Sequence, residues 1–325
     1  MLRSFTAVLC ALAVAFAAVF ATIAAAQSYP ARPIRLFVPY APGGVGDISA
    51  RFVAQRMSES VKQPVVVENR PGAGLIPASE AALKADPDGY TMVLTGNGNA
   101  LSASLFKSMP FDIATDFAHV STIGFFDIAL VANADSPFST AGEVIEYAKR
   151  NPGKLSVATI SIGSTQNLAA ELFRSMAGID VLIVPYKASA AVVTAIRSKD
   201  VQVGFEILAP VISQIRSGGL KALAIGSGKR FSGLPSTPTL QESGVAGYQA
   251  SSWNGISISA KVPRAIVERL NREIVAAVNA PDVRQRMLDL GVDARPSTPE
   301  EMRDLMIADI AKWKAVIDAA RIERQ

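Results

Sequence analysis

The sequence predicts an α/β protein composed of two sets of strands and helices and a helical tail. Short runs rich in β-branched residues alternate with amphipathic stretches, and glycine-rich turns separate them. A strand–helix–strand succession of this kind forms right-handed βαβ units around a parallel sheet. The last third changes character, and its three segments each begin with proline, which is common in the first turn of a helix; they are residues 263–279, 281–290 and 299–320.

Three strands and two helices make up the first set. Asp47 directly precedes the first helix, and aspartate is favoured as an N-cap. The second helix is closed by residues 86–89, Asp-Pro-Asp-Gly, whose residue types are typical of turns. The strands are expected at residues 34–40, 64–68 and 90–95, and the helices at residues 48–60 and 76–85.

The second set begins after a linking segment. Residues 120–128 and 251–258 connect the two sets, and we interpret both as crossovers. The first lobe is then discontinuous, with residues 27–125 and 253–325, and the second lobe comprises residues 126–252. Within it, we expect strands at residues 127–132, 155–160, 181–186, 201–207 and 220–225 and a helix at residues 168–176, with further helices between them.

The first 26 residues have the three parts of a secretory signal peptide. Arg3 is their only charge, an apolar run covers residues 7–21, and three alanines at 24–26 precede Gln27. A permanent anchor is the alternative, but the run is shorter than the roughly 20 residues of a membrane-spanning helix. We predict cleavage after residue 26 and a periplasmic location. Cleavage would remove Cys10, the only cysteine.

The charge of the chain argues against nucleic-acid binding. The 32 Lys and Arg residues and 28 Asp and Glu residues give a net charge of +4, and Arg3 is lost with the signal peptide. The basic residues are spread along the chain and do not cluster with aromatic residues, as they would on a nucleic-acid-binding surface. We expect no nucleic-acid partner.

The loop between the first strand and the first helix is a candidate anion site. It contains Pro42, Gly43, Gly44, Gly46 and Asp47. Glycines permit a ligand to approach the backbone, and the first N–H groups of the following helix are unpaired and favour an anion. The alternative is an ordinary glycine turn with an N-cap.

The same loop partly resembles a dinucleotide-binding fingerprint, with Glu68 at the place of the ribose-binding acid. The third glycine of that fingerprint would fall at position 49, which is Ser49. A phosphate-binding P-loop is excluded as well, because no Gly-Lys-Ser/Thr follows. We therefore expect no cofactor.

Further strand-to-helix loops carry small and hydroxyl residues. In open α/β sheets, ligands bind at such carboxyl ends of strands. Asn97, after the third strand of the first set, either faces the cleft or belongs to a plain turn. The candidate residues of the second set are Ser161, Gly163, Ser164, Thr165 and Gln166 in one loop, and Tyr186, Lys187, Ala188, Ser189 and Ala190 in another.

Signs of catalysis or metal binding are weak. His119 is the only histidine, and we interpret it as a structural residue in a linker with its hydrogen bonds satisfied. The zinc-protease motif H-E-x-x-H and the hydrolase motif G-x-S-x-G do not occur, and no metal ligands cluster. Trp253 and Trp313 are expected to pack in the core or near a crossover. The sequence predicts a binding protein, not an enzyme, without a metal site.

A set of motifs spread over the chain resembles the Bug (TctC-type) family, the extracytoplasmic solute receptors of tripartite tricarboxylate transporters. The resemblance covers essentially everything after the signal peptide. The motifs are Tyr29-Pro30, Pro33-Ile34-Arg35, PYAPGGVGD (39–47), Ala50-Arg51, VVVENRPGAG (65–74), DPDGYT (86–91), MPFDIATDF (109–117), VPYKASAA (184–191), LKALAIGSGKR (220–230) and PTLQESG (238–244).

The resemblance implies a type II periplasmic binding protein, or Venus flytrap, whose two α/β lobes are joined by two crossover strands. It implies a carboxylate ligand held between the first strand–helix loop and the loops of the second lobe, largely through main-chain groups and water. The ligand-binding residues would then be the loop residues named above. Membrane transporter subunits are the implied partners, and we expect a monomer.

Four departures from the family pattern bear on the ligand. Leu75 stands where the family often has glycine, Ala188 replaces glycine, and Gln166 stands at a position that is often histidine. These three could alter the size and polarity of the pocket. Gln202 and Glu206 replace aspartates, and we expect them to affect only the lobe surface.

Two other functions remain open from the sequence. A periplasmic sensor partner that binds a ligand for signalling would share every feature described above. An exported enzyme acting on a carboxylate is the other, although the sequence contains no recognisable nucleophile–base pair.

Overall fold

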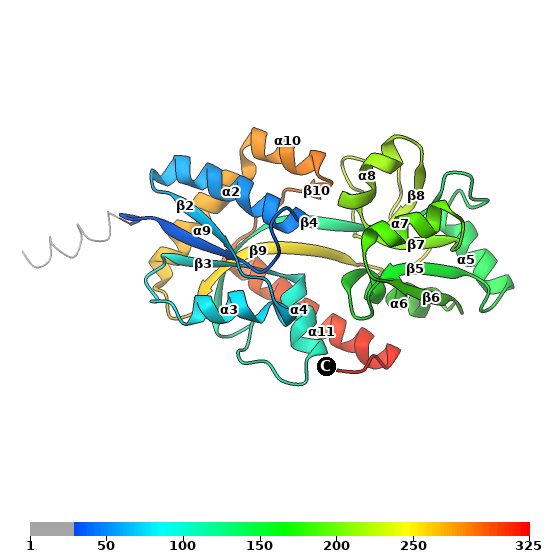
Figure 1. Ribbon diagram of the computed structural model, residues 1–325, viewed down its shortest axis with the longest axis horizontal. Coiled ribbons are helices and arrows are strands. Elements are labelled where there is room, and N and C mark those ends of the chain that lie inside the picture. The colour runs from blue at the N-terminus through cyan, green and yellow to red at the C-terminus, as the bar shows by residue number, and fades with distance from the viewer. Residues whose placement is uncertain (1–28) are drawn as a thin grey trace, which may run out of the picture.

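The computed structural model describes residues 29–325, so the predicted signal peptide lies outside the described residues. Two α/β lobes lie side by side, and the long strands β4 (Phe117–Asn133) and β9 (Ser251–Ser259) run between them (Figure 1). This confirms the predicted fold class, a two-lobed α/β protein with two crossover strands. Among residues 29–325, none of the helices combines the length and the apolar character needed to cross a membrane.

The first lobe contains a mixed sheet in the order β2-β1-β3-β9-β4. Strands β1, β2 and β3 are parallel, β9 is antiparallel to β3, and a short β10 pairs with β4. The elements seen first here are β1 (Ile34–Val38), β2 (Val65–Asn69), β3 (Thr91–Gly96), β10 (Val292–Asp293), α2 (Val45–Val61), η1 (Ala73–Leu75), α3 (Ile76–Leu83), α4 (Asn97–Leu105), α9 (Arg264–Asn279) and α10 (Pro281–Asp289).

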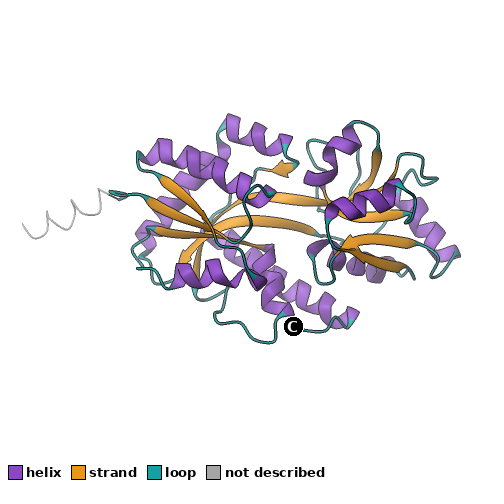
Figure 2. Ribbon diagram, in the orientation of Figure 1, coloured by secondary structure: helices purple, strands orange, loops and turns teal. Residues whose placement is uncertain are grey.

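Helices cover both faces of this sheet (Figure 2). Ile34, Leu36 and Val38 of β1 pack with α2 and α9, whereas Phe37 packs with α3 on the other face. A parallel strand that is buried on both faces is an almost continuous apolar run, which is why residues 34–40 could be recognised as a strand.

The second lobe repeats the arrangement in the order β4-β7-β5-β6, with β8 also pairing with β4. Strands β5, β6 and β7 are parallel to one another, and β7 and β8 are antiparallel to β4. The elements are β5 (Ser156–Ile160), β6 (Leu182–Tyr186), β7 (Val203–Ile207), β8 (Leu220–Ile225), α5 (Ala141–Arg150), α6 (Thr165–Ala177), α7 (Ser189–Arg197) and α8 (Leu208–Arg216).

Strand β4 differs from the sequence prediction, which separated a crossover from a strand at residues 127–132. It is one strand of 17 residues. Residues from Phe117 to Asp127 pair with β9, and residues from Ile128 to Ala132 pair with β7. The crossover is itself rich in β-branched and aromatic residues, so the chain never leaves the extended conformation between the two sheets.

Helix α11 (Pro299–Ala320) joins the lobes from a second side, since it packs on α4 of the first lobe and on α6 of the second. Trp313 donates a hydrogen bond from Nε1 to Asn97 Oδ1 (2.6 Å), and Trp253 Nε1 donates to Asp309 Oδ2 (2.7 Å). Both tryptophans are buried, as expected from the sequence. One apolar cluster therefore continues from the first lobe into the second.

Asp127 lies where β4 changes its pairing partner, and it is only 3% exposed. Its Oδ1 has no hydrogen-bond partner among the described residues. Burial raises the pKa of Asp127 to about 6; Asp293 adds to this effect, while Ser227 and Arg295 oppose it. Between about pH 4 and about pH 6, the Asp127 carboxyl is therefore protonated in the native state and ionised in the unfolded chain.

Replacing Asp127 by asparagine should stabilise the protein at neutral pH but not in acid. A carboxyl whose pKa is raised on folding lowers the free energy of unfolding as pH rises from about 4 to about 6. Asp127→Asn removes this loss, so its advantage over wild type should be about 2–3 kcal/mol larger at pH 7.5 than at pH 4. Denaturant unfolding at the two pH values measures the difference. Asp135→Asn, at an exposed position, is the control, and an equal Asp127→Asn effect at both pH values would contradict the prediction.

Candidate functional site

A cavity of about 740 Å³ lies between the lobes. Strands β4 and β9 contribute to it, so the connection between the lobes forms part of its lining. The lining residues come from both lobes: Tyr40, Ala41, Pro42, Gly44, Val45, Gly46, Ala73, Gly74, Leu75, Gly98, Leu101, Ser102, Leu105, Phe106, Phe126, Ile160, Gly163, Ser164, Thr165, Gln166, Ile207, Ser252, Asn254 and Gln325.

Asp47 organises the first strand–helix loop. The sequence predicted it as the N-cap, but α2 begins at Val45 and its N-cap is Gly44. Asp47, the third helical residue, is 2% exposed and accepts hydrogen bonds from Gly43 N (2.9 Å), Arg51 Nε (3.0 Å) and Asn69 Nδ2 (2.8 Å). The helix therefore begins three residues earlier than the sequence predicted, and the Asp47 carboxylate is hydrogen-bonded back to the loop.

These contacts also settle the charge of Asp47. Burial by itself would raise the pKa of this carboxyl, but the hydrogen bonds from Arg51, Gly43 and Asn69 outweigh it and hold the pKa below its usual value. Arg51, four residues further along α2, is the ion-pair partner of Asp47. Asp47 is thus an ionised residue that holds the loop, and neither it nor Gly43 lines the cavity.

The glycines of the loop differ in how much room they leave for a side chain. A Cβ on Gly46 would lie 2.8 Å from Asn254 Nδ2 and 2.9 Å from the Tyr40 ring, so the helix can approach β9 closely only without a side chain. A Cβ on Gly44 would meet nothing nearer than Ala41 O at 3.8 Å. Gly44 therefore has room for a side chain, which matters for testing the site by mutation.

The loop before α6 faces the same cavity from the second lobe. The helix begins at Thr165, three residues earlier than the sequence predicted, because the hydroxyl of Ser164 caps it and accepts a hydrogen bond from Asn167 N (3.1 Å). Gly163 has φ +78° and donates its N–H to Asn167 Oδ1 (3.0 Å). Ser161 precedes this turn and does not line the cavity.

The N-termini of α2 and α6 thus meet one cavity from opposite lobes. Each first turn offers backbone N–H groups without an intrahelical partner and the positive end of a helix dipole. Burial raises the pKa of Tyr40, on the same wall, to about 12, so its hydroxyl is neutral. In the part of the chain that the structure describes, no lining residue carries a charged side chain. The arrangement suits an anion that is bound without a counter-charge.

The remaining predicted residues lie elsewhere. Helix α7 begins at Ser189 with Ala188 as its N-cap, and Tyr186, Lys187 and Ala190 are on the same segment; none of the five lines the cavity. Asn97 is fully buried as the first residue of α4. It donates from Nδ2 to Thr165 Oγ1 (2.9 Å), so it links the lobes beside the cavity.

Two features of the site were missed from the sequence. The apolar wall formed by Leu101, Leu105 and Phe106 lies on or directly after α4, where the sequence indicated only a turn or a cleft residue. Glu206 was expected on the lobe surface but is completely buried, and its Oε1 accepts hydrogen bonds from Gln166 Nε2 and Ile207 N (both 2.8 Å). The only signals were the departures from the family pattern at Gln166 and Glu206.

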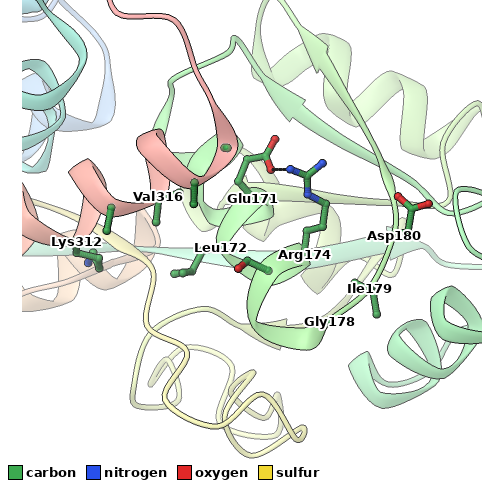
Figure 3. A pocket seen from close by; sticks show the side chains of 12 residues that line it. Glu171, Leu172, Arg174, Gly178, Ile179, Asp180, Lys312 and Val316 are labelled. Atoms are coloured by element: carbon green, nitrogen blue, oxygen red, sulfur yellow. Dashed lines mark ion pairs between the residues drawn. The ribbon is translucent and has the colours of Figure 1, made fainter.

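A second cavity, of about 840 Å³, lies between α6 and α11 (Figure 3). Within it, Glu171 and Arg174 point toward each other, and their oxygen and nitrogen atoms are 2.6 Å apart. Gly178, the C-cap of α6, and residues of the last turn of α11 also line it. The lining cations Arg174 and Lys312 are paired with Glu171 and Asp309. The cavity lies at the C-terminal ends of both helices, where the helix dipoles are negative, so it suits an anion less well than the cavity between the lobes.

His119 lies in β4, not in a linker. Its Nδ1 is 3.0 Å from Ser257 Oγ, whereas its Nε2 has no hydrogen-bond partner among the described residues. We expected both ring nitrogens to be hydrogen-bonded, and only one of them is. Burial lowers the pKa of His119 to about 4, and the nearby Arg303 acts in the same direction. The imidazole is outside the inter-lobe cavity.

Comparison with known proteins places these features in a family. The family model for the tripartite tricarboxylate transporter family receptor matches residues 49–322. The chain is 34% identical to Protein BugT of Bordetella pertussis, over 90% of each chain.

Two solved structures share both fold and sequence with the chain. R. palustris Rpa4515 with adipate has 30% identity and a TM-score of 0.76, over 91% of this chain and 99% of that protein. MatC (Rpa3494) from Rhodopseudomonas palustris with bound malate has 28% identity and a TM-score of 0.71, over 89% of this chain and all of that protein. The chain therefore belongs to the family of tripartite tricarboxylate transporter receptors.

Proposed function

We propose that this protein is a periplasmic receptor that captures a small carboxylate between its lobes and presents it to the membrane subunits of a tripartite tricarboxylate-type transporter. The observation that carries the proposal is the convergence of the N-termini of α2 and α6 on one cavity without charged lining side chains among the described residues. The adipate and malate bound to the two similar structures support a carboxylate ligand. The protein would act as a monomer and would not turn its ligand over.

The mechanism is hinge closure driven by the ligand. The lobes would divide as residues 27–125 with 253–325, and residues 126–252, so each lobe contributes one helix N-terminus. Contacts to both termini exist only when the lobes are together, and ligand therefore shifts the population toward the closed form. The hydrogen bond from Asn97 to Thr165 is one direct contact between the two lobes.

Gly44→Val should abolish carboxylate binding without unfolding the protein. The added side chain has room in the loop but would project where the ligand approaches the backbone, so affinity should fall more than about tenfold. Ser164→Val should also abolish binding, and loss of the α6 cap should cost about 1 kcal/mol of stability. A thermal-shift screen of carboxylates that includes adipate and malate selects the ligand, and calorimetry measures the affinities.

Lys187→Met is the matched control for the claim that main-chain N–H groups bind the carboxylate. Lys187 is exposed and lies outside the cavity lining, so its loss should weaken binding less than about threefold, through long-range attraction alone. If Lys187→Met destroys binding while Gly44→Val retains it, a charge-based pocket replaces the main-chain grip.

Saturating ligand should make the protein more compact. Small-angle scattering of the free and ligand-bound protein measures the radius of gyration, which should decrease on binding because the lobes close. An unchanged profile at saturation would count against hinge closure.

Deletion of the receptor should abolish uptake of the same ligand in cells. Retained uptake with a lost response to the ligand would instead identify a sensor.

A further inference from the structure

One wall of the inter-lobe cavity is apolar. Leu75 of η1, Leu101 and Leu105 of α4, and Phe106 form it on the first lobe. Ser102 is the polar residue among them, but its hydroxyl is already used, because it donates to Gly98 O (2.9 Å). This wall therefore offers a ligand apolar contact and little hydrogen bonding.

The number of carboxylates that the cavity can hold follows from this distribution. A carboxylate that leaves water must be compensated by hydrogen bonds or by an opposite charge. The N-termini of α2 and α6 provide one such place, and no cation lines the cavity within the described residues. A second carboxylate against the apolar wall would lose its hydration without compensation.

Leu75 supports the same conclusion by its backbone conformation. Its φ of +60° and ψ of 18° lie in the left-handed region, which a leucine adopts only at a cost in free energy and a glycine adopts freely. Its side chain nevertheless lies over α4, because a Cβ on Gly98 would be 2.7 Å from Leu75 Cδ1. Strain that persists at the lining of a cavity points to a role for the side chain there.

The apolar wall also reaches the anion site. A Cβ on Gly163, in the loop before α6, would lie 2.9 Å from Leu105 Cδ2. Leu105 of the first lobe thus contacts the loop that leads into the helix N-terminus of the second. The polar and apolar parts of the cavity are therefore adjacent, as a ligand with one charged end and one apolar body would require.

We infer that the cavity takes a monocarboxylate with an apolar body, an aromatic ring or an alkyl chain, and that Leu75 is a specificity-determining residue for it. This inference rests on the proposed function and narrows its ligand class. The carboxylate would lie at the N-termini of α2 and α6, and the apolar body would pack against Leu75 and its neighbours.

Matched acids of equal carbon number test the inference. Calorimetry on the chain without its signal peptide compares hexanoate with adipate, and 4-methylbenzoate with terephthalate. The monoacid of each pair should bind at least about tenfold more tightly. If the diacids bind equally or better, the inference is wrong while the proposed function stands. If none of the four acids, nor any other carboxylate, binds, both are wrong.

Variants at position 75 separate apolar contact from backbone strain. Leu75→Ala and Leu75→Gly both remove the contact, so both should weaken monoacid binding about tenfold or more and change diacid binding little. Only Leu75→Gly relieves the left-handed strain, so it should melt at a higher temperature than Leu75→Ala. Leu182→Ala, at a side chain that is 59% exposed and outside the cavity, is the control. Unchanged monoacid affinity in both Leu75 variants would overturn the role of Leu75.

Discussion

The architecture depends on the shared pairing of β4, which belongs to both sheets. Its first part pairs with β9 and its last part with β7 and β8. Because its backbone bonds are satisfied in each sheet in turn, the chain passes between the lobes without a loop that would expose unpaired groups. The lobes are therefore held at a fixed separation on one side, and a cavity remains beside the connection. Phe126, Ser252 and Asn254 of the two crossover strands line that cavity.

The anion site that we propose in this cavity would depend on backbone geometry more than on charged side chains. Asp47 is an acidic residue close to this site, and its negative charge would repel an anionic ligand if the side chain faced the cavity. It is instead turned into the loop, where Gly43, Arg51 and Asn69 use its hydrogen-bonding capacity. Asn167 plays a similar part at α6, where its side chain accepts the N–H of Gly163. In both lobes a buried polar side chain shapes the loop, and the first two N–H groups of the helix are not used by it.

Buried polar groups between the lobes give the connection its specificity. Asn97 is bonded on one side to Trp313 and on the other to Thr165, so α4, α11 and α6 are tied together through one amide. Each of these groups would be costly to leave unpaired in the interior, which restricts the relative positions that the lobes can adopt. Asp127 and His119 are incompletely bonded within the same long strand, and burial shifts the pKa of each away from the charged form.

Local sequence determined the elements of the fold, and tertiary packing decided which of them form the site. Apolar runs buried on both faces, as in β1 and β5, can be recognised in the amino-acid sequence, and so can the glycine turns that precede α2 and α6. Helix α4 was missed because Gly96-Asn97-Gly98-Asn99 has the composition of a turn, whereas in the structure Asn99 Oδ1 accepts the N–H of Gly96 and the helix packs on α11. The α7 segment has the same local pattern as α6, yet it lies outside the cavity, because the placement of a strand in the sheet is set by long-range pairing. The burial of Glu206 and the apolar wall at Leu75 likewise depend on contacts between residues far apart in the chain, which no local pattern records.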